Sequence, residues 1–235
     1  PAPGIGQAVA SPPASSPGLV AHWAFDERSG DQAADRGGEH KGRVVGATWA
    51  AGRHGGGLCF RGRGDHVGCG TWDLAGEAIT MAAWIKCAPN AADNDARILS
   101  KAVGPQEQDH WWMLSMASEG GERRLRVRLK AGGATTTLIA SRGNLAPDVW
   151  THVAASYDGA RVRLFVNGAD VGSAAKTGLL DANASAAVWL GANPPDGYAA
   201  FDGLIDDVRI YHSALTEKVI ATVMRDGRAS SNSPP

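Results

Sequence analysis

WTHVAASYDGARVRLFVNG, from Trp150 to Gly168, is the stretch that decides the fold class. Its second half alternates apolar residues with Arg161, Arg163 and Phe165, and a period of two residues indicates a β-strand with one buried face. Asp-Gly and Asn-Gly pairs end the two runs, and such pairs are typical of the tight turns that join antiparallel strands. The stretch therefore predicts a β-hairpin.

Short runs of the same kind fill the rest of the chain, and most of them are bounded by Gly, Asn or Asp. They are LVAHWAF, GRVVGATW, GLCFRG, DHVGCG, ITMAAWIKC, ARILSKA, HWWMLSMA, RLRVRLKA, TTTLIAS, AVWLGA and FDGLIDDVRIY. Only TEKVIATVMRDG has the spacing of a helix, with Thr216 as the expected N-cap and Gly227 as the expected terminator. Many short strands without helical crossovers predict an all-β fold, a two-sheet antiparallel jelly-roll sandwich with one short C-terminal helix.

Length and composition limit the classes of function. The chain has 235 residues, enough for one large β domain, and its 31 glycines suit a fold with many turns. A formal charge of −1 gives no electrostatic reason to expect nucleic acid as a partner. No apolar run approaches the ~18 residues of a membrane span, so membrane insertion is not expected.

The two ends differ in composition from the middle. Residues 1–18 are rich in Pro, Ala, Ser and Gly, and residues 227–235 read GRASSNSPP, so we expect a flexible linker and a flexible tail. The folded domain is expected over residues 19–226. The first residues lack the charged and apolar regions of a signal peptide, as expected for a mature secreted protein or for a module of a larger one.

Five blocks of the sequence together carry a resemblance to a known family. They are LVAHWAFDERSGDQAAD, GATWAAGRHGGGLCFRGRGDHV, ITMAAWIK, DVWTHVAASYDGARVRLFVNG and FDGLIDDVRIYHSALT. In order and spacing these blocks resemble the laminin-G-like domains of the concanavalin A-like lectin/glucanase superfamily, over about residues 19 to 223. The resemblance implies two curved antiparallel sheets packed face to face, with the first and last strands adjacent. Because this architecture hosts many functions, function must be argued from individual sites.

The last block places two carboxylates in an apolar strand. Simple alternation puts Asp206 on the face of Val208 and Ile210, where a lone carboxylate would need a partner. The resemblance implies a structural calcium ion bound by Asp26, a backbone carbonyl near Gly62, and Asp206. Calcium prefers such mixed carboxylate and carbonyl oxygens.

Two alternatives to that ligand set stay open. Asp65 could replace or supplement the ligand near Gly62. Asp206 or Asp207 could instead pair with Arg209 or with an arginine of an early strand, without a metal ion.

Three cysteines leave an odd thiol. Cys59 and Cys69 flank RGRGD, at a spacing where two strands of a hairpin could oppose them, so a disulfide is one expectation in an oxidising compartment. The alternative is three buried thiols, with Cys87 as the third.

Catalytic motifs are incomplete. Retaining glucanases of the superfamily carry E-x-D-x-x-E on one strand, and the nearest match here is EQDHWW, where Trp112 replaces the third carboxylate. Glu107 and Asp109 would hold the first two positions. Loop carboxylates such as Asp95 and Asp196 leave a different hydrolase or lyase site open.

A ligand surface is predicted from alternation in the middle strands. Arg126 and Arg128 share the solvent side of RRLRVRLK, and Arg163 takes the same position in RVRLFV. Trp111 is expected beside them and could stack on a sugar ring, and Tyr198 lies in a Gly- and Pro-rich loop. Arginine forks bind carboxylates and sulfates, so this surface would suit an anionic glycan. The alternative is a solvated strand face balanced by nearby carboxylates.

The sequence thus favours a secreted or cell-surface module that binds carbohydrate or another extracellular partner, without catalysis of its own. A glycan-active hydrolase or lyase with an unfamiliar carboxylate pair on the concave face is the alternative. An adhesion domain that contacts only protein is a third reading.

Overall fold

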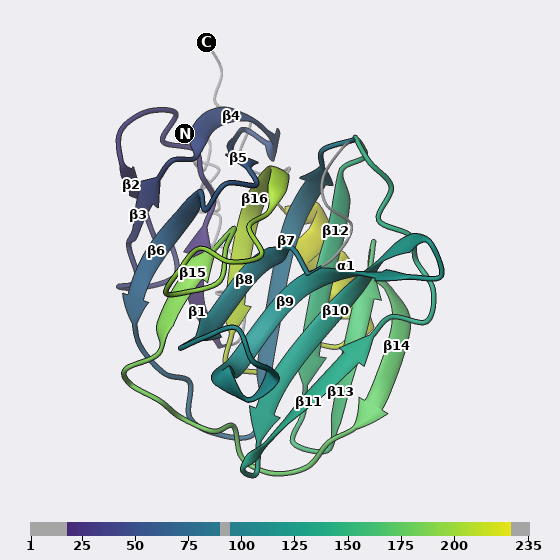
Figure 1. Ribbon diagram of the computed structural model, residues 1–235. Coiled ribbons are helices and arrows are strands. Elements are labelled where there is room, and N and C mark those ends of the chain that lie inside the picture. The colour runs from purple at the N-terminus through teal and green to yellow at the C-terminus, as the bar shows by residue number, and fades with distance from the viewer. Residues whose placement is uncertain (1–17, 90–94, 227–235) are drawn as a thin grey trace, which may run out of the picture.

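The computed structural model describes residues 18–89 and 95–226. Two antiparallel sheets pack face to face, and a single short helix lies on the outside of one of them (Figure 1). This arrangement confirms the predicted jelly-roll sandwich and C-terminal helix. The predicted linker, apart from Gly18, and the predicted tail lie outside the described residues.

The first sheet has the order β14-β13-β12-β7-β16-β5-β4, and β1 also pairs with β16. Because β1 and β16 pair, the first and last strands are adjacent, as the resemblance implied. The bounds are β1 Leu19–Trp23, β4 Thr48–His54, β5 Gly56–Arg61, β7 Ile79–Cys87, β12 Thr151–Tyr157, β13 Arg161–Val166, β14 Ala169–Ala175 and β16 Asp202–Tyr211.

The second sheet has the order β11-β10-β9-β8-β15-β6-β3-β2. Its strands are β2 Gln32–Ala33, β3 Gly42–Val45, β6 His66–Thr71, β8 Arg97–Ala102, β9 His110–Glu119, β10 Glu122–Ala131, β11 Ala134–Ile139 and β15 Ala187–Leu190. A 3-10 turn, η1, covers Glu107–Asp109 before β9. The hairpin predicted for Trp150 to Gly168 is β12–β13, paired from Val153 with Val166 to Tyr157 with Val162.

The core lies between the sheets and is built by alternation. In β10, Leu125, Val127 and Leu129 are buried in it, so the arginines between them face outward. Trp23 and Trp112 are among the largest buried side chains. Packing of this kind is the main source of stability in a sandwich.

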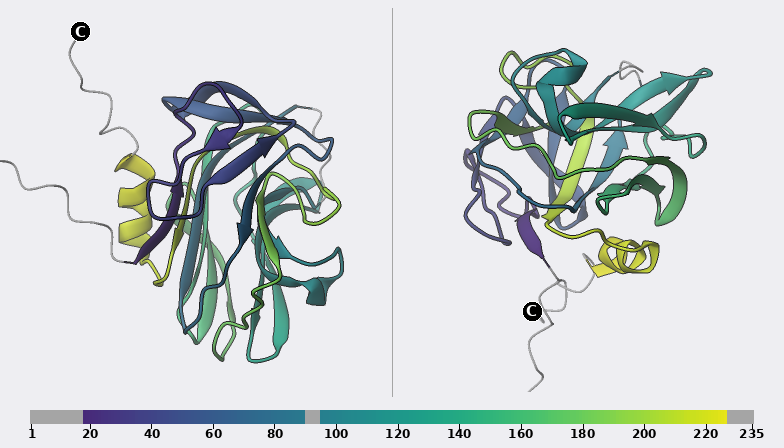
Figure 2. Two further views of the ribbon diagram at one scale, coloured as in Figure 1. Left: turned by 90° about the vertical axis from the view of Figure 1, so that its left-hand side faces the viewer. Right: turned by 90° about the horizontal axis from the view of Figure 1, so that it is seen from below.

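The helix α1, Glu217–Asp226, lies against the outer face of the first sheet (Figure 2). Its buried residues Ile220 and Val223 join Phe165 and Tyr211 in a small second apolar cluster. The Val219 amide donates to Oγ1 of Thr216 at 3.4 Å, so Thr216 caps the helix as predicted. No described helix is long and apolar enough to cross a membrane.

A β-bulge corrects the predicted alternation in β16. Asp206 opposes Trp84 and Arg209 opposes Ala82, so β16 has one more residue than β7 between these pairs. Asp207 has a φ of 50° at this point. Because the bulge resets the period, Val208 and Ile210 enter the core while both adjacent carboxylates face outward. Asp206 therefore does not share a face with Val208 and Ile210.

The expected disulfide is absent from the described residues. Cys59 lies on β5 in the first sheet and Cys69 on β6 in the second, so the turn between them crosses between sheets instead of closing a hairpin. Both are free thiols, as is Cys87.

Candidate functional site

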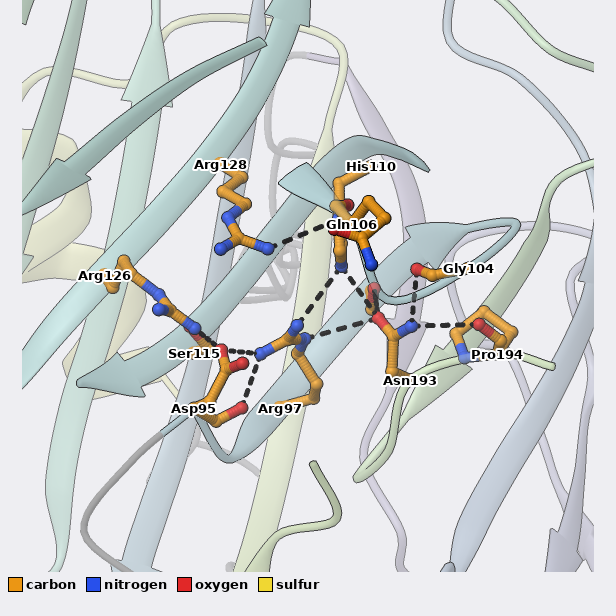
Figure 3. Close-up of polar contacts among 11 residues, drawn as sticks. Asp95, Arg97, Gly104, Gln106, His110, Ser115, Arg126, Arg128, Asn193 and Pro194 are labelled. Carbon is orange, nitrogen blue, oxygen red and sulfur yellow. Dashed lines mark hydrogen bonds and ion pairs between the residues drawn. The ribbon is translucent and has the colours of Figure 1, made fainter. Parts of the chain in front are cut away.

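Three arginines meet on the outer face of the second sheet, and we call Arg97, Arg126 and Arg128 the arginine cluster (Figure 3). Alternation in β10 directs Arg126 and Arg128 outward. Arg97 reaches the same face through a bulge in β8. Arg97 opposes Ser115 and Leu99 opposes Leu114, so two residues of β8 advance while β9 advances by one. The bulge lets two consecutive apolar residues of β8 enter the core behind Arg97.

One carboxylate links two of these guanidinium groups. Asp95 is ion-paired with Arg97 and also with Arg126. Among the described residues it is the only carboxylate ion-paired with the arginine cluster. Arg126 also donates from Nε to Oγ of Ser115 at 3.0 Å. The cluster therefore keeps an excess of positive charge.

Burial makes that positive charge costly. Arg97 is fully buried and Arg126 nearly so. Burial, together with repulsion from Arg128, lowers the pKa of Arg97 to about 9 and that of Arg126 to about 10. No described group accepts a hydrogen bond from the buried Nε of Arg128. An anion beside these groups would offset both the desolvation and the mutual repulsion.

A buried amide holds the loops around the cluster. Oδ1 of Asn193 accepts from Oγ of Ser100 at 2.8 Å and from Nε of Arg97 at 3.3 Å. Its Nδ2 donates to the carbonyl oxygens of Gly104 and Pro194, each at 2.9 Å. Asn193 thus ties strand β8 to two loops on the same face of the sheet.

Tyr198 stands at the edge of the cluster. Tyr198 forms an isolated backbone β-bridge with Asn193, and the residue is 54% exposed. It is close enough to influence the pKa of each arginine in the cluster. A pocket of about 490 Å³ opens beside it, lined by Pro105, Asn193, Pro194, Asp196, Gly197 and Tyr198. This pocket offers an amide and an aromatic ring to a ligand, and Asn193 in its lining contacts Arg97; the arginines themselves are not among its lining residues.

Of the five predicted ligand residues, Arg163 lies on a different sheet from the other strand residues. The structure brings Arg126, Arg128 and Tyr198 together. Trp111 lies on β9, half-buried, and the ammonium group of Lys130 is 4.9 Å from its ring centroid. Arg163 does not join them, because β13 belongs to the first sheet, where Arg163 pairs with Asp158 at 2.6 Å.

Sequence reasoning missed Arg97, His110 and Asn193. Arg97 lies at the start of the apolar strand ARILSKA, and no residue pattern around it predicts the bulge that turns its side chain outward. Asn193 lies 96 residues from Arg97, so its role is visible only in three dimensions. Asp95 was noted only as a loop carboxylate.

The incomplete glucanase motif EQDHWW lies only partly on a strand, because its first three residues form η1 and its last three begin β9. Glu107 and Asp109 belong to η1, where Glu107 accepts a hydrogen bond from Oγ1 of Thr137 at 2.6 Å. Asp109 accepts from the amide of Gln106 at 3.0 Å. Both carboxylates thus stabilise the turn that leads into β9.

A second polar pocket, of about 320 Å³, lies on the outer face of the first sheet and contains two of the predicted calcium ligands, Asp26 and Asp206. Asp206 is fully buried and its Oδ2 accepts from the amides of Arg53 and His54 at 2.8 and 2.9 Å. No described group donates to its Oδ1. Burial raises the pKa of Asp206 to about 7.

The other residues near this pocket clarify the open alternatives. Asp26 accepts from the amide of Gly56 and from Nη2 of Arg36, each at 2.8 Å. Asp207 pairs with His22 at 2.6 Å and with Arg209 at 2.9 Å, so the predicted pairing with an arginine holds for Asp207.

The third predicted calcium ligand lies elsewhere. The amide of Gly62 donates to the carbonyl of Phe201, and Gly62 adjoins Asp202 at the start of β16, outside the pocket. Asp65 pairs with Arg61 instead. Gly55, in the turn between β4 and β5, lines the pocket where the ligand near Gly62 was expected.

The fit to calcium rests on the buried, unpartnered Oδ1 of Asp206 and on Asp26 beside it. No group of three or more His, Cys, Asp or Glu among the described residues is arranged to hold a metal ion. A calcium ion here would therefore need backbone oxygens or water in addition to the two carboxylates.

Comparison with known proteins establishes the family. Residues 61–221, more than half of the chain, match the family model Laminin_G_3, described as the concanavalin A-like lectin/glucanases superfamily. The chain belongs to this family. This membership confirms the resemblance read from the sequence.

Two curated proteins are similar in sequence to part of this chain. Adhesion G-protein coupled receptor V1 of Danio rerio is 24% identical over 146 residues, which are 60% of this chain and 2% of the receptor. Pappalysin-1 of Mus musculus is 32% identical over 128 residues, which are 51% of this chain and 8% of pappalysin-1. The chain thus spans a small part of the length of these relatives.

A similar solved structure is domain 4 of AbnA, a GH43 extracellular arabinanase from Geobacillus stearothermophilus, in complex with arabinotriose. It has a TM-score of 0.68 at 22% identity and covers 88% of this chain and 98% of that chain. At this level of identity the likeness shows the fold.

Replacing Asn193→Ala should destabilise the domain by about 3 kcal/mol, because buried polar groups that lose a partner cost about 1–3 kcal/mol each. Urea unfolding measures the loss. Asn183→Ala is the matched control, since the Asn183 side chain accepts only from the exposed amide of Ser185 among the described contacts. Equal losses in the two variants would contradict the role of Asn193.

Proposed function

We propose that this domain binds anionic carbohydrate through the arginine cluster. The observation that carries the proposal is the burial of several guanidinium groups around Asp95, the one carboxylate that pairs with them in the part of the chain that the structure describes. A guanidinium fork is matched by the carboxylate of a uronic acid or by a sulfate ester. The pocket beside Tyr198 has room for a sugar ring, and Asn193 in its lining contacts Arg97 of the cluster.

The comparisons support carbohydrate as the ligand class. The fold is that of the concanavalin A-like lectin/glucanases superfamily, and domain 4 of AbnA was solved with arabinotriose bound. The preference for anionic sugars comes from this chain's own arginines.

A location outside the cell suits such a ligand. The AbnA protein is described as extracellular, and a curated relative is an adhesion receptor. We propose that this chain is likewise a secreted or cell-surface module, which binds glycan directly or as part of an adhesive surface.

The double variant Arg126→Gln, Arg128→Gln should weaken binding of oligogalacturonate and of chondroitin sulfate at least tenfold, because hydrogen bonds to charged groups contribute about 1.5–3 kcal/mol each. Raising the salt concentration should also weaken binding of these glycans to the parent protein, because salt screens the charges. Isothermal titration calorimetry measures both effects.

The matched control is Arg161→Gln, Arg163→Gln, which removes the same charge from alternate positions of β13 on the other sheet. It should bind like the parent protein. Equal binding of a neutral arabino-oligosaccharide, without a salt effect, would contradict the anionic preference. New reducing ends released from any of these glycans would favour the hydrolase or lyase alternative.

We propose as well that the pocket of Asp26 and Asp206 holds a structural calcium ion. Chelator should then lower the melting temperature and added calcium should restore it, since a ligand at 100 times its Kd stabilises by about 2.7 kcal/mol. Asp206→Asn should remove the response.

Asp202→Asn is the matched control for this prediction, because Asp202 lies on the same strand outside the pocket. Its response to chelator should equal that of the parent protein. A parent protein whose melting is indifferent to chelator, with no calcium found by elemental analysis, would contradict the proposal.

A further inference from the structure

His110, at the start of β9, is fully buried in the middle of the polar network that supports the arginine cluster (Figure 3). Its Nδ1 lies 2.7 Å from the backbone oxygen of Gln106. Its Nε2 lies 2.9 Å from Oδ1 of Asn193. Each ring nitrogen therefore faces an oxygen that accepts hydrogen bonds.

The orientation of the Asn193 amide is fixed by its other contacts. Nδ2 donates to the carbonyl oxygens of Gly104 and Pro194, so a reversed amide would place Oδ1 against two acceptors. The hydroxyl of Ser100 also donates to Oδ1. Oδ1 is thus held facing His110.

A neutral imidazole cannot satisfy both contacts. It carries one N–H: with the proton on Nδ1 it donates to Gln106, and Nε2 then accepts from Nη2 of Arg97 while its lone pair also faces Oδ1 of Asn193. The protonated ring donates to both oxygens. The contacts with the two oxygens therefore favour the charged form of His110, and the contacts with the two arginines favour the neutral form.

The surrounding charges favour the neutral form. Nη2 of Arg97 is 3.3 Å from Nε2, and Nη1 of Arg128 is 3.5 Å from Nδ1. Burial is the largest cause, and repulsion from Arg97 the next, of a lowered pKa for His110. Within residues 18–89 and 95–226, the ionisable groups around the ring and its arginine neighbours are Arg97 and Asp95 on the β8 side, Arg126 and Arg128 on β10, Glu107 and Asp109 in η1, and Tyr198 in the loop after β15.

We propose that His110 takes up a proton when an anion binds at the arginine cluster, so that the site binds its ligand more tightly in acid. This inference rests on the proposed function and adds that pH regulates the affinity of the arginine cluster for its ligand. An anion neutralises the guanidinium groups that oppose the charged ring, and the two hydrogen bonds of the ring to Gln106 and Asn193 then hold the proton. Binding and protonation favour each other by the same factor.

The sign of the pH dependence follows from this linkage. The bound state holds the His110 proton more strongly than the free state, so affinity rises as pH falls through the range between the two pKa values. The rise is limited to about tenfold per pH unit, because one proton is exchanged. Above that range the ring is neutral in both states and affinity no longer depends on it.

Histidine NMR on the whole chain, with inorganic sulfate as the probe, tests the proposal. Sulfate keeps the same charge between about pH 5 and 8, where histidine titrates. At constant ionic strength, sulfate should raise the titration midpoint of His110 by about one pH unit relative to chloride. The midpoint of His66, which stacks on Trp189 in the same sheet, should not move.

Variants identify the groups involved. His110→Gln should bind sulfate with an affinity that no longer rises in acid, and its spectrum assigns the His110 signal. Arg126→Gln, Arg128→Gln should abolish the effect of sulfate on His110, whereas Arg161→Gln, Arg163→Gln should preserve it.

The outcomes separate this inference from the proposed function. Sulfate binding at the arginine cluster with an unchanged His110 midpoint would overturn the inference and leave the proposed function in place. No saturable sulfate effect at the cluster would overturn both. A raised His110 midpoint without glycan binding would support the proton coupling and reject carbohydrate as the ligand.

Discussion

The face-to-face packing of two sheets is the constraint on which the rest of this structure depends. Each strand can send only alternate side chains into the space between the sheets, so its remaining side chains must face outward. Loops and the helix α1 then cover parts of both outer faces, as Figure 2 shows for the helix. Some polar side chains that face outward are buried under these loops and the helix. Each of them therefore needs a hydrogen bond or a counter-charge.

The two outer faces meet this requirement in different ways. On the second sheet, the arginine cluster has one ion-paired carboxylate among the described residues, Asp95, which is shared between Arg97 and Arg126. On the first sheet, Asp26, Asp206 and Asp207 gather at one pocket, and Asp206 keeps an oxygen without a described donor. These arrangements are the basis of our proposals of an anion at the arginine cluster and of calcium at the pocket of Asp26 and Asp206, in a chain whose formal charge is −1.

Both polar sites lie at β-bulges. The bulge in β8 turns Arg97 onto the face of Ser115, and the bulge in β16 places Asp206 and Asp207 on one side of the strand. A bulge adds one residue and so reverses the alternation beyond it. Bulges thus let a strand keep an apolar inner face and still direct a chosen polar side chain outward.

The sequence by itself determined the fold class, the C-terminal helix and the outward direction of Arg126 and Arg128. These follow from the spacing of neighbouring residues, which is local and read directly from the chain. It could not assign strands to sheets, and so it grouped Arg163 with the wrong face and left open a pairing of Cys59 with Cys69 that the structure does not form.

Only the tertiary structure decided which distant residues meet. Arg97, His110 and Asn193 come from separate strands and loops, and Gly62 lies away from the pocket to which the resemblance assigned it. The physical reason is that sheet pairing and bulges are set by packing over the whole domain. A single inserted residue moves a side chain to the opposite face without any local change in composition.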